Sequence, residues 1–260
     1  GSVPGLQKNP VQVVGLTNIV AVAVGQGHSL ALHADGAVFT WGFIIGGTNT
    51  PVQEPALANI VAIAAGLKHS LALRSDGAVF AWGLNEHGQL GDGRTNTQTL
   101  PIHIASISGA TSIAAGHFHS LATLADRTVL AWGSNKRGQL GNGTTTGSLV
   151  PTVVNGLNNA VRDVAGGHHS LALLEDGTVM SWGRNSHGEL GHGDFDDALT
   201  PAPVIGLGCA VSLAAGSQHS MARCDDGTVH AWVSNLFDQL GDGSGVNQPT
   251  PVTLDTISVP

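Results

Sequence analysis

The sequence predicts an all-β fold, a β-propeller of about five four-stranded blades. Two observations predict this fold: a unit that recurs along the whole chain, and a hairpin signal inside every unit. A His-Ser pair and a Trp anchor each unit, and both anchors occur five times, with steps of 41, 50, 50 and 50 residues. Because this repeat leaves no room for a linker, we expect residues 1–260 to form a single domain. The anchors are His28, His69, His119, His169 and His219, and Trp41, Trp82, Trp132, Trp182 and Trp232.

Each unit opens with a run of small and β-branched residues that ends in Gly. Residues of this kind suit a strand with crowded neighbours on both faces, and their small size lets adjacent blades converge. We therefore expect this strand to be the innermost one and to line a tight centre. The runs occupy residues 19–25, 60–66, 110–116, 160–166 and 210–216.

The second strand of each unit begins at the anchor His, and the third contains the anchor Trp. An Asp-Gly pair such as Asp176-Gly177 lies between them and predicts a tight hairpin, because Gly adopts a positive φ without steric cost. Asp126-Arg127 replaces this pair in the third unit, so we expect a looser turn or another turn type there. The Trp side chain is large enough to fill the space between adjacent blades. A solenoid is the alternative architecture, but a parallel β-helix contains no hairpins.

A short extended segment that starts with Pro completes each unit. Pro has no N–H to donate to a neighbouring strand, so the segment suits the outer edge of a blade. It occurs six times, whereas every other strand occurs five times. The surplus copy predicts a ring closed by a terminal strand, an excised part of a longer ring, or an open array that closes by self-association. The segments start at Pro10, Pro51, Pro101, Pro151, Pro201 and Pro251.

Composition and charge disfavour several classes of partner. The formal net charge of −8 argues against a phosphate-binding surface, so we expect no nucleic-acid partner. No apolar run approaches the roughly 20 residues that span a bilayer, so we expect a soluble protein, cytoplasmic or secreted, without a membrane partner. The Gly1-Ser2 start without Met is typical of an expression scar. Cys209 and Cys224 lie in one unit without CxxC spacing, and we expect two unpaired small hydrophobic residues rather than a disulfide.

The most regular units carry a specific motif. Residues 64–93 and 114–143 closely follow the pattern AAGxxHSLALxxDGxVxAWGxNxxGQLGDG, which resembles the repeat of the regulator of chromosome condensation family. The resemblance covers the whole chain and implies a propeller, usually of seven blades, whereas this chain has five sets of anchors. The first unit lacks the GQLGDG segment, and the last departs from the pattern at Val233. The Ala-rich repeats favour a bacterial origin, which would suit a secreted effector that acts on a host GTPase.

The repeated residues predict no catalytic site. Ser29 and its counterparts adjoin the anchor His, but neighbours in a strand point to opposite faces and cannot pair as nucleophile and base. The anchor His side chains would lie too far apart to share a metal ion, so we expect them to make structural hydrogen bonds. The GQLGDG segment lacks the Lys of a phosphate loop, and residues 194–197 lack the spacing of a Ca²⁺ loop. We therefore expect no enzyme activity, no metal and no cofactor.

Function is expected at positions that vary while the scaffold repeats. One such position is the pair of residues before each anchor His, which should cluster on one face of the ring near its axis. A second variable pair lies just before the GQLGDG segment. Loops on a rigid scaffold usually carry binding, so we predict partner-binding residues at both positions, with drifting loop sequence as the alternative. These residues are Gln26, Lys68, His117, Phe118, His168 and Gln218 in the first set, and His87, Lys136, Arg137 and His187 in the second.

We expect a non-catalytic scaffold for protein–protein interaction, whose partner is another protein. The family resemblance implies an alternative, guanine-nucleotide exchange on a Ran-like small GTPase. Exchange uses an inserted β-wedge, and no unit here exceeds 50 residues, which disfavours this activity. A further alternative is an inhibitor that covers the active site of an enzyme. Such inhibitors with similar repeats use aromatic residues, and Phe118 is the only Phe, Trp or Tyr in the first set.

Overall fold

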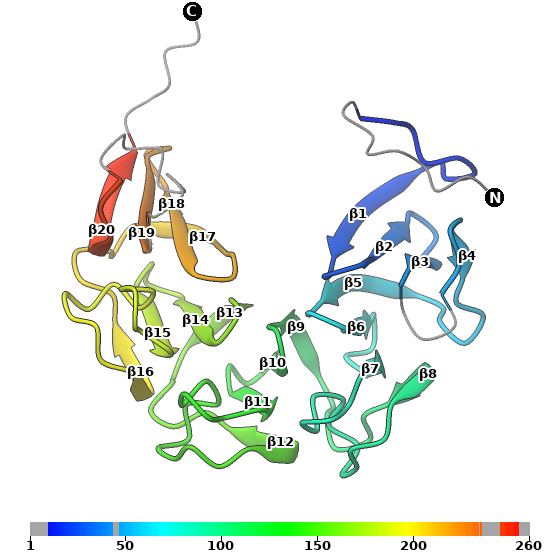
Figure 1. Ribbon diagram of the computed structural model, residues 1–260, viewed down its shortest axis with the longest axis horizontal. Coiled ribbons are helices and arrows are strands. Elements are labelled where there is room, and N and C mark those ends of the chain that lie inside the picture. The colour runs from blue at the N-terminus through cyan, green and yellow to red at the C-terminus, as the bar shows by residue number, and fades with distance from the viewer. Residues whose placement is uncertain (1–9, 44–46, 234, 236–244, 255–260) are drawn as a thin grey trace, which may run out of the picture.

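The computed structural model describes residues 10–43, 47–233, 235 and 245–254. These residues form twenty strands in five separate four-stranded antiparallel sheets. Figure 1 shows the five sheets following one another around an arc. The predicted all-β architecture of five propeller blades is therefore confirmed. The described part of the chain has no helix that could cross a membrane.

Each blade takes its four strands from consecutive parts of the chain, and they pair in that order from the first to the fourth. Blade by blade, the strands are β1 (Ile19–Val24), β2 (His28–His33), β3 (Val38–Gly42) and β4 (Val52–Gln53); β5 (Ile60–Ala65), β6 (His69–Arg74), β7 (Val79–Gly83) and β8 (Gln98–His103); β9 (Ala110–Ala115), β10 (His119–Leu124), β11 (Val129–Gly133) and β12 (Ser148–Val153); β13 (Ala160–Ala165), β14 (His169–Leu174), β15 (Val179–Gly183) and β16 (Ala198–Pro203); and β17 (Ala210–Ala215), β18 (His219–Cys224), β19 (Val229–Val233) and β20 (Gln248–Leu254).

The first strand of each blade lies on the inside of the arc, as the small residues predict (Figure 1). These strands contact one another in sequence, β1 with β5, β5 with β9, β9 with β13, and β13 with β17. The second residue of the strand is nevertheless exposed, for example Val61, of whose surface 56% is accessible. The expected crowding on both faces is therefore wrong at this position, because its side chain projects away from the neighbouring blades.

The hairpin between the second and third strands is the same in blade 3 as in its neighbours. In blade 2, Gly77 has a φ of 83° and its N–H donates to the carbonyl of Arg74 at 2.9 Å. In blade 3, Arg127 has a φ of 71° and donates to the carbonyl of Leu124 at 2.8 Å. The expected change of turn type is wrong, because Arg127 adopts the left-handed conformation itself, at a steric cost of roughly 1–2 kcal/mol. An exposed ion pair from Arg127 to Glu175 accompanies this turn.

A Pro-containing strand forms the outer edge of blades 2 to 5, but Pro lies inside it and does not start it; in blade 1, Pro51 directly precedes β4. In blade 2, Pro101 lies inside β8, in the irregular stretch between the Ala81–Ile102 and Gly83–Gln98 pairs. Such an irregularity removes the need for a ladder hydrogen bond, which Pro cannot donate. Residues 10–13 form no strand.

The arc of blades is open. Blade 1 and blade 5 form its two ends in Figure 1, and none of the described strands near the start of the chain joins the sheet of blade 5. Closure by a terminal strand, one of the three predicted arrangements, is therefore wrong for the described residues. Closure by self-association stays a prediction.

Adjacent blades are joined by a hydrogen bond between the anchor His of each of the first four blades and a Ser in the following blade. The distance from His Nε2 to Ser Oγ is 3.1 Å for His28 and Ser70, and 3.0 Å for His69 and Ser120. The hydroxyl of Ser120 donates its single proton to the carbonyl of Gln89 at 2.8 Å, so the His nitrogen must be the donor to Ser. Ser170 and Ser220 also donate to carbonyls, and burial lowers the pKa of His69, His119 and His169, so these three rings are neutral with the proton on Nε2. The same bond joins His119 to Ser170 at 3.0 Å and His169 to Ser220 at 2.9 Å.

The two ends of the arc lack this bond. Within the described residues, Ser29 of blade 1 receives no bond from a His, and His219 of blade 5 meets no Ser. The Gly that ends each first strand is also part of the junction. A Cβ at Gly66 would lie 2.2 Å from Cε1 of His69 and 2.4 Å from the carbonyl oxygen of Gly116 in the next blade. Only Gly leaves room for the imidazole ring and the neighbouring blade at once.

The anchor Trp fills the junction between blades, as predicted. Trp132 is fully buried and packs in a cluster with Leu71 and Leu90 of blade 2. Its Nε1–H donates to the carbonyl of Gln89 at 2.8 Å, the same oxygen that accepts from Ser120. Trp82 has no such bond, because the short first unit lacks the segment that would supply the carbonyl.

Cys209 and Cys224 form a disulfide, with their Cα atoms 4.9 Å apart. The expectation of two unpaired residues is therefore wrong. Cys209 directly precedes β17, and Cys224 ends β18, where it pairs with Ala210. The antiparallel register brings the two ends of the hairpin together, which sequence spacing alone did not reveal.

We predict a large loss of stability for Trp132→Ala. The substitution should lower the free energy of unfolding by about 3–5 kcal/mol, because it opens a cavity between blades 2 and 3. Trp41→Ala is the matched control: Trp41 is partly exposed at the start of the arc and should cost less than about 2 kcal/mol. Urea denaturation of both variants measures the difference. Equal losses would contradict the inter-blade role of the ring.

We also predict that acid unfolds the protein through its buried His residues. Burial is the main cause that lowers the pKa of His69 and of His169 to about 3. Because these values lie below the unfolded value, the stability they contribute is complete above about pH 6.5 and is lost as pH falls toward about 3. Within this range, each of the two His residues should lower the free energy of unfolding by about 1.4 kcal/mol for every unit by which the pH falls.

Urea midpoints measured between neutral and acidic pH test this dependence. His169→Gln should flatten the slope, whereas His103→Gln, at an exposed position on β8, should leave it unchanged. A wild-type stability that does not vary over this range would rule out the neutral buried rings.

Candidate functional site

The pairs of residues before the anchor His form two-residue hairpin loops between the first and second strands. Each loop is closed by a bond from the preceding Gly N–H to the His carbonyl, 2.9 Å long in blade 1 between Gly25 and His28. The first residues of the five loops surround a central cavity of about 280 Å³, together with the ends of the inner strands. These residues are Gln26, Leu67, His117, Gly167 and Ser217.

A second cavity, of about 260 Å³, lies where the two variable sets meet, and we call it the basic cavity. Residues from blades 2, 3 and 4 contribute to it, so it spans two blade junctions. Its lining includes two Arg and one Lys but no Asp or Glu. The lining residues are His87, Phe118, Ser134, Lys136, Arg137, Gln139, His168 and Arg184.

Ring contacts connect the two sets of variable residues. His87, from the second set, meets the edge of Phe118 with ring centroids 5.0 Å apart. The ring centroid of His168 lies 6.2 Å from that of Phe118 and 5.1 Å from that of His117. Aromatic pairs in this range gain energy beyond simple burial. The result is a continuous surface of rings from the basic cavity to the central cavity.

Two His residues of this surface, His117 and His168, are uncharged at neutral pH. Burial, followed by the nearby charges of His117, Arg184 and Arg137, lowers the pKa of His168 to about 4. Burial and then Arg184 also lower the pKa of His117. Neutral imidazoles offer one donor and one acceptor each, so the positive charge of the cavity resides on its Lys and Arg side chains.

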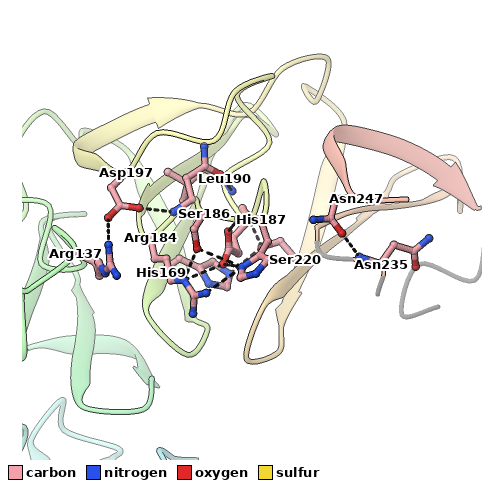
Figure 2. Close-up of polar contacts among 12 residues, drawn as sticks. Arg137, His169, Arg184, Ser186, His187, Leu190, Asp197, Ser220, Asn235 and Asn247 are labelled. Carbon is pink, nitrogen blue, oxygen red and sulfur yellow. Dashed lines mark hydrogen bonds and ion pairs between the residues drawn. The ribbon is translucent and has the colours of Figure 1, made fainter. Parts of the chain in front are cut away.

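The guanidinium of Arg184 is held in place by three neighbours, all in one loop of blade 4 (Figure 2). Its Nε donates to Ser186 Oγ at 2.7 Å and lies 3.4 Å from a carboxylate oxygen of Glu189, and its Nη2 lies 3.0 Å from His187 Nδ1. Glu189 is fully buried and occupies the position of Gln89 and Gln139 in other blades. A buried carboxylate requires a cationic partner, and Arg184 provides it.

The other two cations are less constrained. Arg137 Nη1 lies 3.3 Å from Asp197 of blade 4, whose second oxygen accepts from the N–H of Asn185 at 2.9 Å (Figure 2). The Arg137 side chain remains 56% exposed. Lys136 is exposed and makes no hydrogen bond or ion pair with any residue that the structure describes.

The structure divides the predicted binding residues into three groups. Five line the basic cavity: His87, Phe118, Lys136, Arg137 and His168. Gln26 and His117 line the central cavity. Lys68, Gln218 and His187 line neither of these cavities, although His187 contacts Arg184.

Arg184, Ser134 and Gln139 also line the cavity, although they were not among the predicted binding residues. Gln139 is buried at a repeated position, and nothing in its sequence distinguishes it from scaffold, whereas Ser134 is a small buried residue at a position that varies. Arg184 did carry a signal. It follows the Trp-Gly pair, where the second and third units have Leu84 and Ser134, so its charge departs from the repeat.

The paired His and Ser side chains cannot act as a catalytic dyad. Ser120 donates to a carbonyl and accepts from His69, so the imidazole does not act as a base toward the hydroxyl. Both side chains are also fully buried.

One group of described side chains has the spacing of metal ligands. The ligand atoms of Cys209, Cys224 and His230 lie within 4.8 Å of one another. The two sulfur atoms form the disulfide, so they are not the thiolates that a metal binds.

In the acidic loop of residues 194–197, Asp194 accepts hydrogen bonds from the side chain of Asn185 and from the backbone of Asp196.

Comparison with known proteins gives consistent matches. The model of the RCC1-like domain matches residues 2–208, and that of the regulator of chromosome condensation (RCC1) repeat matches residues 210–239. No curated protein matches the chain by sequence.

Similar solved structures include yeast RCC1 (Prp20) bound to Kap60, which is 28% identical with a TM-score of 0.84 over 93% of this chain and 62% of that chain. Prp20p from Saccharomyces cerevisiae, described with its binding properties to Gsp1p and histones, has the same identity and TM-score over 93% of this chain and 64% of its own. Human WBSCR16 is 24% identical, with a TM-score of 0.82 over 90% of this chain and 66% of that chain; this likeness shows the fold alone. The chain thus spans less than two thirds of the length of the two yeast chains.

Proposed function

The chain belongs to the RCC1-like domain family, and from this premise we propose that it is a non-catalytic propeller that binds another protein through the basic cavity. One observation carries the proposal. Five of the ten residues selected because they vary against a repeating scaffold meet in a single cavity, although they come from three blades. Variable loops on a rigid scaffold are the usual carriers of binding.

The chemistry of this face supports binding rather than catalysis. Phe118, Arg137 and Arg184 are of the residue types enriched at the centres of protein interfaces, where Trp, Tyr, Phe, Met and Arg are favoured. The described part of the cavity contains no nucleophile paired with a general base. The net charge of −8 favours a protein partner over a nucleic acid.

A Ran-like small GTPase is the second candidate partner. Prp20p, which is 28% identical to this chain, is described with binding to Gsp1p and histones. The short units of at most 50 residues leave no room for an inserted wedge, so we expect binding without nucleotide exchange.

Protein binding through the basic cavity can be tested with a matched pair of variants. The immobilised chain is cross-linked to proteins in an extract of the cells that express it. Phe118→Ser should lose the captured partner with only a small fall in melting temperature, because the ring forms the wall of the cavity but only partly enters the core. Phe195→Ser is the control, since Phe195 is exposed and lines neither cavity. Capture that is the same for both variants would place the binding surface elsewhere.

The GTPase candidate is tested by release of a fluorescent guanine nucleotide from purified Ran. We expect the chain to leave the rate of release unchanged, because it has no inserted wedge. A pull-down on the same sample reports whether Ran binds at all. Accelerated release would overturn the non-catalytic proposal and replace it with exchange.

A further inference from the structure

We infer that the basic cavity receives the carboxylate side chain of an acidic segment of the partner protein. This inference rests on the proposed function, because it assigns the chemistry of the group bound at the same site. Three features of the cavity carry it: the sign of its charge, the state of its cations and its size.

The cavity is positive although the protein as a whole is negative. The chain has 18 Asp and Glu residues against 10 Lys and Arg. Three of those ten cations, Lys136, Arg137 and Arg184, line this one cavity, and none of its eight lining residues is acidic. Asp197 and Glu189, outside the lining, each pair with one of the two Arg, so the unpaired positive charge is that of Lys136. A cavity lined by charges of one sign focuses the electric field and attracts ligands of the opposite charge. The bound group is therefore an anion.

The structure itself shows a carboxylate at the rim of the cavity. Asp197 from the loop of blade 4 contacts Arg137 from blade 3, through a single nitrogen at 3.3 Å. Arg137 keeps most of its five donors free for a second acceptor. Lys136, the adjacent residue, has no described partner, so one further carboxylate can be neutralised here without breaking an existing ion pair.

Arg184 supplies a fixed donor from the opposite side of the junction. Its contacts with Ser186, His187 and Glu189 use Nε and Nη2, and no described contact uses Nη1. Because these neighbours already hold the guanidinium in place, a ligand meets a donor whose side-chain entropy has been lost beforehand. Planar guanidinium groups match carboxylates in geometry.

Size and lining favour a peptide side chain over a larger small molecule as the occupant. The volume of about 260 Å³ is below the ~300–1,000 Å³ of typical small-molecule pockets. Phe118 and the neutral His168 add an apolar wall beside the cations, which suits the methylene groups of Asp or Glu and the peptide that carries them.

The experiment uses a short fluorescein-labelled peptide of alternating Asp and Ala residues, with an Asn–Ala peptide of equal length as its neutral counterpart. Fluorescence anisotropy at low ionic strength should show binding of the Asp peptide and at least about tenfold weaker binding of the Asn peptide. The double variant Lys136→Gln, Arg137→Gln should also bind the Asp peptide at least about tenfold more weakly.

The control variant carries Arg94→Gln and Arg162→Gln, which remove the same charge from exposed positions outside the cavity. It should bind the Asp peptide like the wild type, and melting temperatures confirm that all variants fold. An equal loss in both double variants would reduce the effect to general charge attraction and overturn the inference. Binding of a phosphoserine peptide, with no binding of the Asp peptide, would also overturn the inference.

Failure of this inference differs from failure of the proposed function. If the Asp peptide does not bind but Phe118→Ser still abolishes capture of the partner, the cavity binds a protein by other chemistry. If capture is independent of Phe118, the proposed site itself is wrong.

Discussion

The structure depends on one buried carbonyl oxygen at each regular blade junction. The carbonyl of Gln89 accepts from Ser120 and from Trp132, both in the next blade, while Ser120 accepts from His69 in the blade that supplies the carbonyl. Four groups thus satisfy one another across the interface. A buried polar group left without a partner costs about 1–3 kcal/mol, so the spacing between these groups is strongly constrained. This explains why the His, Ser, Trp and Gly-rich segments recur together.

Most of the fold could be predicted because its determinants are local and repeated. The period of the anchors and the Asp-Gly hairpins gave the number of blades and the order of strands, and the size of the Trp gave its place between blades. Contacts between residues distant in sequence could not be predicted in this way. The Cys209–Cys224 disulfide depends on strand register. The buried Asp163 accepts a hydrogen bond from Thr123 in the preceding blade at 2.7 Å. In the sequence, Asp163 and Thr123 are each an isolated departure from the repeat, with nothing to show that they are partners.

The candidate site could be predicted only in part, for a similar reason. Comparing the repeats identifies which loop positions vary, but it does not say which loops converge. Two-residue hairpins direct their first residue to the central cavity and their second toward the neighbouring blade, so His117 and Phe118 serve different cavities. Arg184 belongs to the site because it pairs with the buried Glu189. In the sequence, Glu189 is only a replacement of Gln by Glu, and its need for a cationic partner follows from its burial.

The hydrogen bond from His to Ser also gives the array a direction. At the three junctions between blades 2 and 5 the preceding blade donates and the following blade accepts, so the ends of the arc are chemically different: blade 5 presents the His219 ring, and blade 1 presents the Ser29 hydroxyl. A contact that pairs one end of the arc with the same end of a second copy would set donor against donor, or acceptor against acceptor. Only head-to-tail addition, in which blade 1 of one unit follows blade 5 of another, continues the pattern. The arc thus has a plus end and a minus end, as a polar filament has.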